Sequence, residues 1–334
     1  MTDTRLDVLC IGNAIVDVIA NATDEFLSAE GLVKGSMRLI DAEEAERLYS
    51  HMGPAHQVSG GSAGNTAAGV AAFGGRAGFI GQVAPDQLGE FYIHDLRAAG
   101  VEFTTPAADV GEPTARSMIL VTPDGHRTMN TFLGAAQHLP ASALDEGQIR
   151  GAGAIYLEGY LWDPETPRYA MIRAIEIARS AGRKVAFSLS DTFCIERHRD
   201  GFNALIDGGK IDLLFANQAE IEMLAGIPHL DSAVEAVRGK VETLVVTRGE
   251  EGALATRGQY VARVPAEPVS NVVDTTGAGD LFAAGFLAGY AWGRSLEQSL
   301  KLGAIAAAEV IQHYGARPEA DLRALAGELA ATAE

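Results

Sequence analysis

Short apolar runs alternate with polar turns along most of the chain. Residues 6–11 form an apolar run broken only by Asp7, and it stops at Gly12-Asn13, which is typical of a buried strand in a parallel sheet. Strands that alternate with helices indicate a parallel sheet covered on both faces. The pattern predicts further strands over residues 15–21, 79–83, 154–157, 185–189, 213–216 and 243–247, and helices from Asp41 onward and over 65–73, 86–100 and 168–181.

Residues 112–137 have a different pattern. Two β-type runs, 117–121 and 128–132, flank Pro123-Asp124-Gly125, which predicts a hairpin. The hairpin has too little apolar surface for a core unit, so we expect it at an edge or in a lid. We predict one large α/β domain over residues 1–334, with a small β lid built from about 15–40, including a short strand at 37–40, and from 112–137. A second hairpin at 253–263 is followed by helices over roughly 280–292, 296–312 and 319–332.

Composition excludes several classes of protein. Apolar residues make up 47% of the chain, which is enough for a large core and rules out global disorder. The net charge of −18 disfavours nucleic acid and anionic membranes as partners. The uncharged apolar stretch at 281–293 is shorter than the roughly 18 residues that a membrane span needs. Two cysteines, no CxxC and no signal-peptide pattern predict a soluble, cytoplasmic protein.

The strongest chemical motif is Asp-Thr-Thr-Gly-Ala-Gly-Asp at 274–280, which directly precedes an apolar helix. The first N–H groups of a helix lack internal partners and lie at the positive end of its dipole. Gly277, Ala278 and Gly279 are therefore predicted to form an anion hole. A carboxylate there would repel the anion, so Asp280 is predicted to take a proton from a nucleophile that attacks it. The alternative is a glycine-rich turn with Asp280 as a helix cap.

A second glycine-rich motif, Gly-Gly-Ser-Ala-Gly-Asn, occupies residues 60–65. One interpretation is a loop whose backbone approaches a polar ligand, with Asn65 as a hydrogen-bonding side chain. Another is the nucleophile elbow of α/β hydrolases, with Ser62 as the nucleophile, although the polar residues 56–59 fit its preceding strand poorly. A third is close helix–sheet packing through small residues.

Other polar residues follow predicted strands, where ligands of parallel sheets bind. Asn13 and Asp17 offer a donor and acceptors for sugar hydroxyls, or are only a turn residue and a solvated carboxylate. Tyr160 and Trp162 are either core aromatics or faces of a pocket for a planar ring. The sequence contains no HExxH and no Walker A motif. Two more segments follow strands directly: Asn217-Gln218-Ala219-Glu220 and Thr247-Arg248-Gly249-Glu250-Glu251-Gly252.

These five motifs, in this order, resemble the ribokinase-like (PfkB) sugar-kinase family over nearly the whole chain. The resemblance implies a ribokinase-like three-layer α/β/α sandwich with a mostly parallel central sheet. Three stretches are most similar to its adenosine-kinase branch: 24–27 with the region after it, 125–136, and 158–161. The implied activity is ATP-dependent phosphorylation of a nucleoside 5′-hydroxyl, with adenosine as the expected acceptor.

The resemblance also implies roles for individual residues. Asp280 would be the catalytic base, with Gly277, Ala278 and Gly279 as the anion hole and Arg127 as a lid arginine near the transferred phosphate. Residues implied to bind the acceptor are Asn13, Asp17, Gly60, Gly61, Asn65, Met129, Thr131, Leu161 and Trp162. Residues implied to bind nucleotide and ions are Asn217, Thr247, Gly249 and Gly252, with Glu220 on Mg²⁺ through water, and Asp274 and Thr276 on a monovalent cation such as K⁺.

Alternative functions stay open at this point. Another kinase of the same family, acting on ribose, fructose or ketodeoxygluconate, would share every motif. A hydrolase using Ser62 and a non-catalytic nucleoside-binding sensor are more distant possibilities. The family includes monomers and homodimers, and the adenosine-kinase resemblance favours a monomer.

Overall fold

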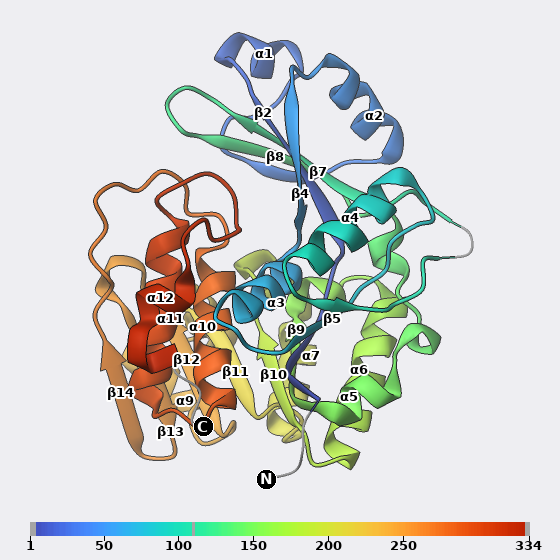
Figure 1. Ribbon diagram of the computed structural model, residues 1–334. Coiled ribbons are helices and arrows are strands. Elements are labelled where there is room, and N and C mark those ends of the chain that lie inside the picture. The colour runs from blue at the N-terminus through green and yellow to red at the C-terminus, as the bar shows by residue number, and fades with distance from the viewer. Residues whose placement is uncertain (1–4, 109–110, 331–334) are drawn as a thin grey trace.

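The computed structural model describes residues 5–108 and 111–330, which form a large body and a smaller lobe above it (Figure 1). The body contains a nine-stranded sheet in the order β14-β13-β12-β11-β10-β9-β1-β5-β6. From β12 through β11, β10, β9, β1 and β5 to β6, neighbouring strands are parallel. The pairs β12–β13 and β13–β14 are antiparallel, so the predicted mostly parallel sheet is confirmed. The strands are β1 (Leu6–Ile11), β5 (Ala77–Ile80), β6 (Glu102–Phe103), β9 (Ala152–Glu158), β10 (Lys184–Ser188), β11 (Leu213–Asn217), β12 (Thr243–Thr247), β13 (Ala253–Arg257) and β14 (Tyr260–Val264).

Helices cover both faces of this sheet, which confirms the three-layer arrangement. Successive side chains of a strand point to opposite faces, so Leu9 and Ile11 pack in one core while Val8 and Cys10 pack in the other. The first core includes α5 (Glu146–Gly151), α6 (Glu165–Ser180), α7 (Thr192–Asp207), α8 (Gln218–Ala225) and α9 (Leu230–Val237). The second includes α3 (Ser62–Ala72), α4 (Gln87–Ala98), α10 (Ala278–Ala291) and α11 (Leu296–Val310).

The upper lobe is a separate five-stranded sheet, which we call the lid sheet, in the order β3-β8-β7-β2-β4. Its strands are β2 (Ile15–Asn21), β3 (Met37–Leu39), β4 (Ala55–Gly60), β7 (Ala115–Val121) and β8 (Arg127–Phe132). Four of them lie in the ranges 15–40 and 112–137. The fifth, β4, lies outside those ranges. It was not predicted because most residues of Ala55–Gly60 are polar or glycine.

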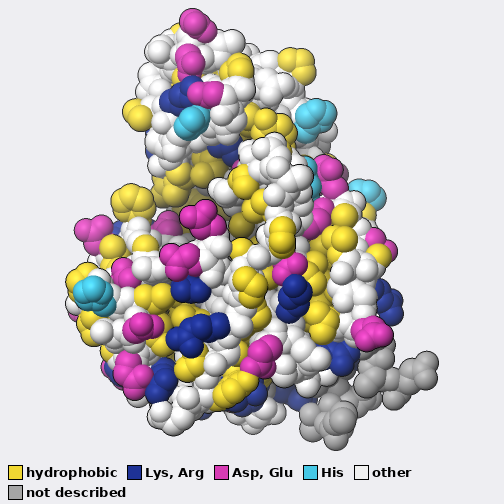
Figure 2. Space-filling view, turned by 90° about the vertical axis from the view of Figure 1, so that its left-hand side faces the viewer, with side chains coloured by type: hydrophobic (Ala, Val, Ile, Leu, Met, Phe, Trp, Pro, Cys, Tyr) yellow, Lys and Arg dark blue, Asp and Glu magenta, His cyan; other side chains and the backbone are white. Residues whose placement is uncertain are grey.

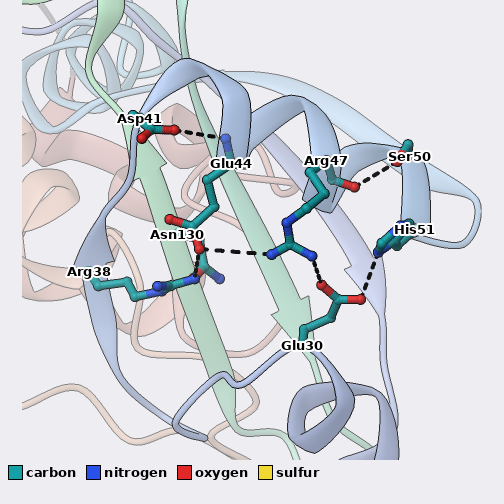
Figure 3. A network of polar contacts seen from close by, with 8 residues as sticks. All are labelled: Glu30, Arg38, Asp41, Glu44, Arg47, Ser50, His51 and Asn130. Atoms are coloured by element: carbon teal, nitrogen blue, oxygen red, sulfur yellow. Dashed lines mark hydrogen bonds and ion pairs between the residues drawn. The ribbon is translucent and has the colours of Figure 1, made fainter.

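One face of the lid sheet packs against α1 (Asp24–Ala29) and α2 (Ala42–His51). A polar network joins these helices to the sheet (Figure 3). Glu30, just after α1, accepts from Arg47 at 2.5 Å and lies 2.7 Å from His51 Nδ1. Arg38 on β3 donates to Glu44 at 2.6 Å and to Asn130 at 2.8 Å. The network therefore fixes β8, whose Met129 and Thr131 face the opposite side of the lid sheet.

Several element ends differ from the predictions. Helix α3 begins at Ser62 instead of residue 65, and the strand predicted at 79–83 is β5 at Ala77–Ile80. The predicted helix over 319–332 is only α12 (Leu322–Ala326), because Gly327 has a φ of +53° and starts a 3₁₀ turn; residues 331–332 lie outside the described residues. The 3₁₀ turns are Gly134–His138, Ala141–Ala143, Gly159–Trp162, Gly249–Glu251 and Gly327–Ala330. Among the helices of the described chain, none combines the length and hydrophobicity needed to cross a bilayer.

Helices α10 and α11 approach closely through glycines. A Cβ atom added at Gly285 would lie 2.4 Å from the carbonyl oxygen of Leu302, and one added at Gly303 would lie 2.7 Å from that of Phe282. Since backbone atoms block both positions, no side chain fits there unless the helices separate. This contact fixes α10, whose first turn carries residues 278–280.

Replacing Gly285 with alanine should therefore lower the free energy of unfolding by about 3 kcal/mol, because overpacking against backbone cannot be relieved by a rotamer change. Chemical denaturation of the purified protein measures this. Gly151→Ala is the matched control, since its new Cβ would meet only Arg5 Cβ at 3.6 Å. We expect the control to be neutral or to stabilise the protein by up to about 1 kcal/mol. Equal stability of the Gly285 variant and the unmodified protein would contradict the close helix contact.

Candidate active site

A cavity of about 370 Å³ lies where the lid sheet faces the carboxyl ends of the parallel strands. This volume is in the range of small-molecule sites, and the position is where parallel sheets bind ligands. Strands β2, β7 and β8 line it from the lid side, and the ends of β9 to β12 together with the start of α10 line it from the body. Figure 2 shows the hollow between lobe and body, with hydrophobic side chains inside it and acidic side chains near its rim.

Asp280 lies at the centre of the cavity wall, in the first turn of α10. Its Oδ1 accepts from Ser62 Oγ at 2.6 Å and its Oδ2 accepts from Asn65 Nδ2 at 2.9 Å. The two glycine-rich motifs, 218 residues apart at Ser62 and Asp280, are therefore joined by this carboxylate. Burial raises the pKa of Asp280, while the bonds from Ser62 and Asn65 act in the opposite direction.

The start of α10 provides free N–H groups, but not all three that were predicted. Gly277 caps the helix with a φ of +77°, and Gly277 and Gly279 line the cavity. Ala278 does not line it, because its N–H already donates to the carbonyl of Thr275 at 3.2 Å and its side chain packs against the core beneath α11. The predicted role of Ala278 as an anion donor is therefore corrected, whereas Gly277 and Gly279 face the space where an anion would bind.

Asp17 on β2 also lines the cavity. A Cβ atom at Gly60 would lie 2.3 Å from Asp17 Oδ2, so Gly60 leaves room for this carboxylate. Gly61 adopts a φ of +82° and its Cα packs against Asn13, where a Cβ would lie 2.2 Å from the carbonyl oxygen. Burial raises the pKa of Asp17 to about 7, with Arg317 and Arg127 acting against that shift. Asp17, Gly61 and Asn65 thus line the same cavity.

Asn13 does not face the cavity, which corrects its predicted contact with the acceptor. Its backbone N–H and its side-chain amide both donate to Glu158 Oε1 at 2.7 Å. Glu158 Oε2 accepts from the N–H of Ala63 at 2.7 Å, so this buried carboxylate ties the β1–β2 turn to the start of α3. Burial raises the pKa of Glu158 to about 7, against the three N–H donors. The sequence signal for Glu158 was a lone charge that ends the apolar strand 154–157.

The lid side of the cavity presents both apolar and polar side chains. Met129 and Thr131 line it, together with Ile15, Ile119 and Ser117, which no motif indicated. Thr131 Oγ1 and Ser117 Oγ lie 2.8 Å apart and share a hydrogen bond.

Among the aromatics after β9, Tyr160 lines the cavity and its hydroxyl donates to the Ser190 carbonyl at 3.2 Å. Leu161 and Trp162 do not line it and belong to the core instead. Trp162 packs edge-on against Phe187 and Phe202. The prediction that Leu161 and Trp162 form the base pocket is corrected, because the 3₁₀ turn Gly159–Trp162 turns only Tyr160 toward the cavity.

At the other end of the cavity lie Asn217, Glu220 and Thr247. Glu220 accepts from both the N–H and the side-chain amide of Asn217, at 2.9 and 2.7 Å, and Asn217 in turn caps α8. Burial raises the pKa of Glu220 to about 7.

The glycines after Thr247 do not line the cavity. Gly252 has a φ of +83°, and a Cβ there would lie 2.1 Å from the Val264 carbonyl, so its role is in the turn between β12 and β13. Gly249, with a φ of +56°, begins the 3₁₀ turn that follows Thr247. Their predicted contacts with nucleotide have no support from the geometry.

Arg127 on β8 reaches from the lid sheet to the body. It forms a buried ion pair with Asp274 and donates to Thr276 Oγ1 at 3.3 Å. Asp274 also accepts from the N–H groups of Thr276 and Gly315, each at 3.0 Å. Both oxygens of the Asp274 carboxylate therefore have partners, and one partner is the cation Arg127, so this arrangement does not fit the predicted monovalent cation. Among the described residues, no group of three or more His, Cys, Asp or Glu side chains could hold a metal directly.

The arrangement suits transfer of an anionic group to a hydroxyl. An acceptor between Asp17 and Asp280 would have a carboxylate for its reacting proton, and the Gly277 and Gly279 N–H groups would face the incoming anion. It does not suit a serine hydrolase. Ser62 donates to a carboxylate and has no histidine partner among the described residues, whereas the nucleophilic serine of a Ser-His-Asp triad donates to an imidazole, which is a stronger base than a carboxylate.

Comparisons with known proteins agree with this geometry. The model of the pfkB family of carbohydrate kinases matches residues 5–322. The solved structure of adenosine kinase from Sinorhizobium meliloti is 50% identical, covers 96% of this chain and 98% of its own, and has a TM-score of 0.90. That of a probable sugar kinase from Rhizobium etli is 48% identical, with coverages of 97% and 98% and a TM-score of 0.91. Adenosine kinase from Saccharomyces cerevisiae is 27% identical over 332 residues, which are 92% of this chain and 95% of that protein.

The family match spans both glycine-rich motifs and the strands that hold them, and the resemblance deduced from the motifs is confirmed. The chain belongs to the pfkB family of carbohydrate kinases, phosphotransferases that act on the hydroxyl groups of sugars or nucleosides.

Proposed function

We propose that this protein is an ATP-dependent kinase that transfers the γ-phosphoryl group to the 5′-hydroxyl of adenosine. The observation that carries the proposal is the Asp280 carboxylate, held by Ser62 and Asn65 in the first turn of α10, beside the free N–H groups of Gly277 and Gly279. The adenosine kinase of Sinorhizobium meliloti, at 50% identity over nearly the full length, supports the choice of acceptor.

The chain's own residues account for the reacting hydroxyl. Asp280 takes its proton as the hydroxyl oxygen forms a bond to the γ-phosphorus, and the bond from that phosphorus to the bridging oxygen breaks to release ADP. The N–H groups at the start of α10 stabilise the charge on the transferred group, an effect of about 3 kcal/mol per donor in comparable sites. Asp17 accepts hydrogen bonds from the ribose hydroxyls, which fixes the 5′-hydroxyl relative to Asp280.

Kinases of this family use ATP and typically Mg²⁺. Glu220 fits a hydrated divalent cation, since it is a buried carboxylate at the cavity wall with only neutral donors from Asn217 beside it. When bound, Mg²⁺ would neutralise charge on the β- and γ-phosphates. Asn217 holds Glu220 in place, and Thr247, at the end of the neighbouring strand, lies at the same nucleotide end of the cavity.

Three apolar side chains of the lid side, which we call the apolar lid face, support a nucleoside over a plain sugar. Ile15, Ile119 and Met129 offer little to a polyhydroxyl compound but form a surface for a planar base, with the Tyr160 ring also in the cavity wall. The lid sheet also separates the reacting groups from water, which limits hydrolysis of ATP. A sugar kinase of the same family is the second candidate, favoured by the 48% identity to the probable sugar kinase of Rhizobium etli.

Replacing Asp280 with asparagine should lower kcat with adenosine and MgATP by 10²- to 10⁴-fold, because the base is lost while the shape is kept. Asn65 has an unpaired buried Oδ1, so it can rotate its amide to accept from the new side chain. Ser62→Ala is the matched control, which removes one donor and should cost only about tenfold. A loss below tenfold in the Asp280 variant, in a coupled ADP assay, would refute the base assignment.

A substrate screen tests the choice of acceptor. With MgATP, kcat/KM for adenosine should exceed those for ribose, fructose and ketodeoxygluconate by at least about 100-fold, because only the nucleoside fills the apolar lid face. Tyr160→Ala should lower kcat/KM for adenosine by about tenfold through lost ring contact, while Tyr160→Phe, which keeps the ring, should remain close to the unmodified enzyme. Faster turnover of any plain sugar would favour the sugar-kinase alternative.

A further inference from the structure

The segment that follows α11, residues 315–317, contacts three parts of the active site. The N–H of Gly315 donates to Asp274 at 3.0 Å. Ala316 packs so closely on Gly277 that a Cβ added to the glycine would lie 2.5 Å from that of Ala316. Arg317 reaches Ser59 near the end of β4 and Gly64 at the start of α3. No motif and no role assigned so far includes this segment.

The guanidinium of Arg317 joins the lid sheet to the body. Its Nη1 donates to the carbonyl of Gly64 at 3.0 Å, and its Nη2 donates to Ser59 Oγ at 2.9 Å and to the Ser59 carbonyl. Ser59 lies near the end of β4 in the lid sheet, and Gly64 lies in the first turn of α3 in the body. One planar fork therefore bridges the point at which the chain passes from lid to body.

The two carboxylates of the site both contact the same stretch of chain, residues 60–65. Asp280 is held by Ser62 and Asn65, on either side of Gly64. Asp17 lies against Gly60, the residue after Ser59. Every hydrogen bond that the Arg317 guanidinium donates within the described chain ends on an uncharged oxygen. Its positive charge is thus not cancelled by a close carboxylate and acts on the wider group of acids.

The positive charge of Arg317 affects the pKa of both carboxyl groups of the site. Arg317 lowers the pKa of Asp17 and of Asp280, in each case against burial. Desolvation lowers the pKa of Arg317 itself, and nearby acids oppose that shift. The other titratable groups facing this cluster are Tyr92 and Asp95 on α4, Tyr156 and Glu158 on β9, Tyr160 after β9, Arg127 on β8 and Asp274 before α10.

We propose that Arg317 is a positioning residue for phosphoryl transfer: its positive charge favours the ionised forms of Asp17 and Asp280, and its guanidinium holds β4 against α3. This rests on the proposed role of Asp280 as the base. Asp17 and Asp280 share one cavity with an incoming polyanion, and like charges raise the pKa of a carboxyl group. Without the positive charge of Arg317, the pKa of each carboxyl group would rise further. A protonated Asp280 can no longer accept the proton of the hydroxyl.

The test is the pH dependence of kcat and kcat/KM between pH 5 and 9, with MgATP and adenosine, or with the sugar that the substrate screen selects in its place. In Arg317→Gln, the acid limb of both profiles should move up by about one pH unit, the size expected for loss of a nearby opposite charge. Activity at pH 6 should then fall about tenfold more than activity at pH 9.

Arg168→Gln is the matched control, because Arg168 also donates to backbone carbonyls, those of Trp162 and Asp163, but is not among the charges that act on Asp280. Its profiles should coincide with those of the unmodified enzyme. A purely structural role for Arg317 would lower activity by the same factor at every pH, and that result would overturn the proposal.

Arg317→Lys keeps the charge but not the fork, and it tests the proposal even where the glutamine variant does not fold. Its acid limb should stay at the original pH, although KM rises. An acid limb that moves upward in the lysine variant would overturn the proposal. The outcome is separable from that of the proposed function: a large loss in Asp280→Asn with an unshifted Arg317→Gln profile rejects only the role of Arg317.

Discussion

The whole site depends on holding negative charge next to the place where more negative charge must bind. Asp280 lies in the first turn of α10, where the helix dipole favours a carboxylate as well as a phosphoryl group. Its two oxygens accept from neutral donors, Ser62 and Asn65, so neither donor is a cation that would compete with a proton for the carboxylate. The protein of net charge −18 can therefore handle a polyanion through local dipoles, whatever the sign of its overall field.

The same constraint explains the contacts between lid and body. Two arginines join the lid sheet to the body, and each ends beside acids of the site: Arg127 on Asp274, and Arg317 on the turn between Ser59 and Gly64. Glu158 makes a third tie, between the β1–β2 turn and α3. Lid position and site electrostatics are thus carried by the same few side chains, and a change in one affects the other.

The sequence pattern predicted the elements whose formation depends on nearby residues, which are the central strands and the lid hairpin. The central strands were predicted because a strand buried on both faces is continuously apolar, and the hairpin at 117–132 because its turn residues are specific. Strand β4 was not, since its pairing with β2 is a tertiary effect that overrides a polar sequence. Motifs also identified Asp280, Asn65, Asp17 and Glu220 at the cavity. They gave no role to Glu158, although it begins the stretch 158–161, and did not indicate Arg317, because the contacts of single charged residues at strand and loop ends form only once distant segments meet.

The errors at individual residues have one physical source. A motif indicates that a segment reaches the site, but only the backbone turn decides which of its side chains or N–H groups face the cavity. The turn after β9 directs Tyr160 inward and Trp162 into the core, and the turn at 275–278 uses the N–H of Ala278 for itself. One residue can also have both a structural role and a proposed chemical role. Asn217 caps α8 and, through the reciprocal bonds of the same capping box, holds Glu220 at the cavity wall, so the helix cap and the proposed ion site are one arrangement.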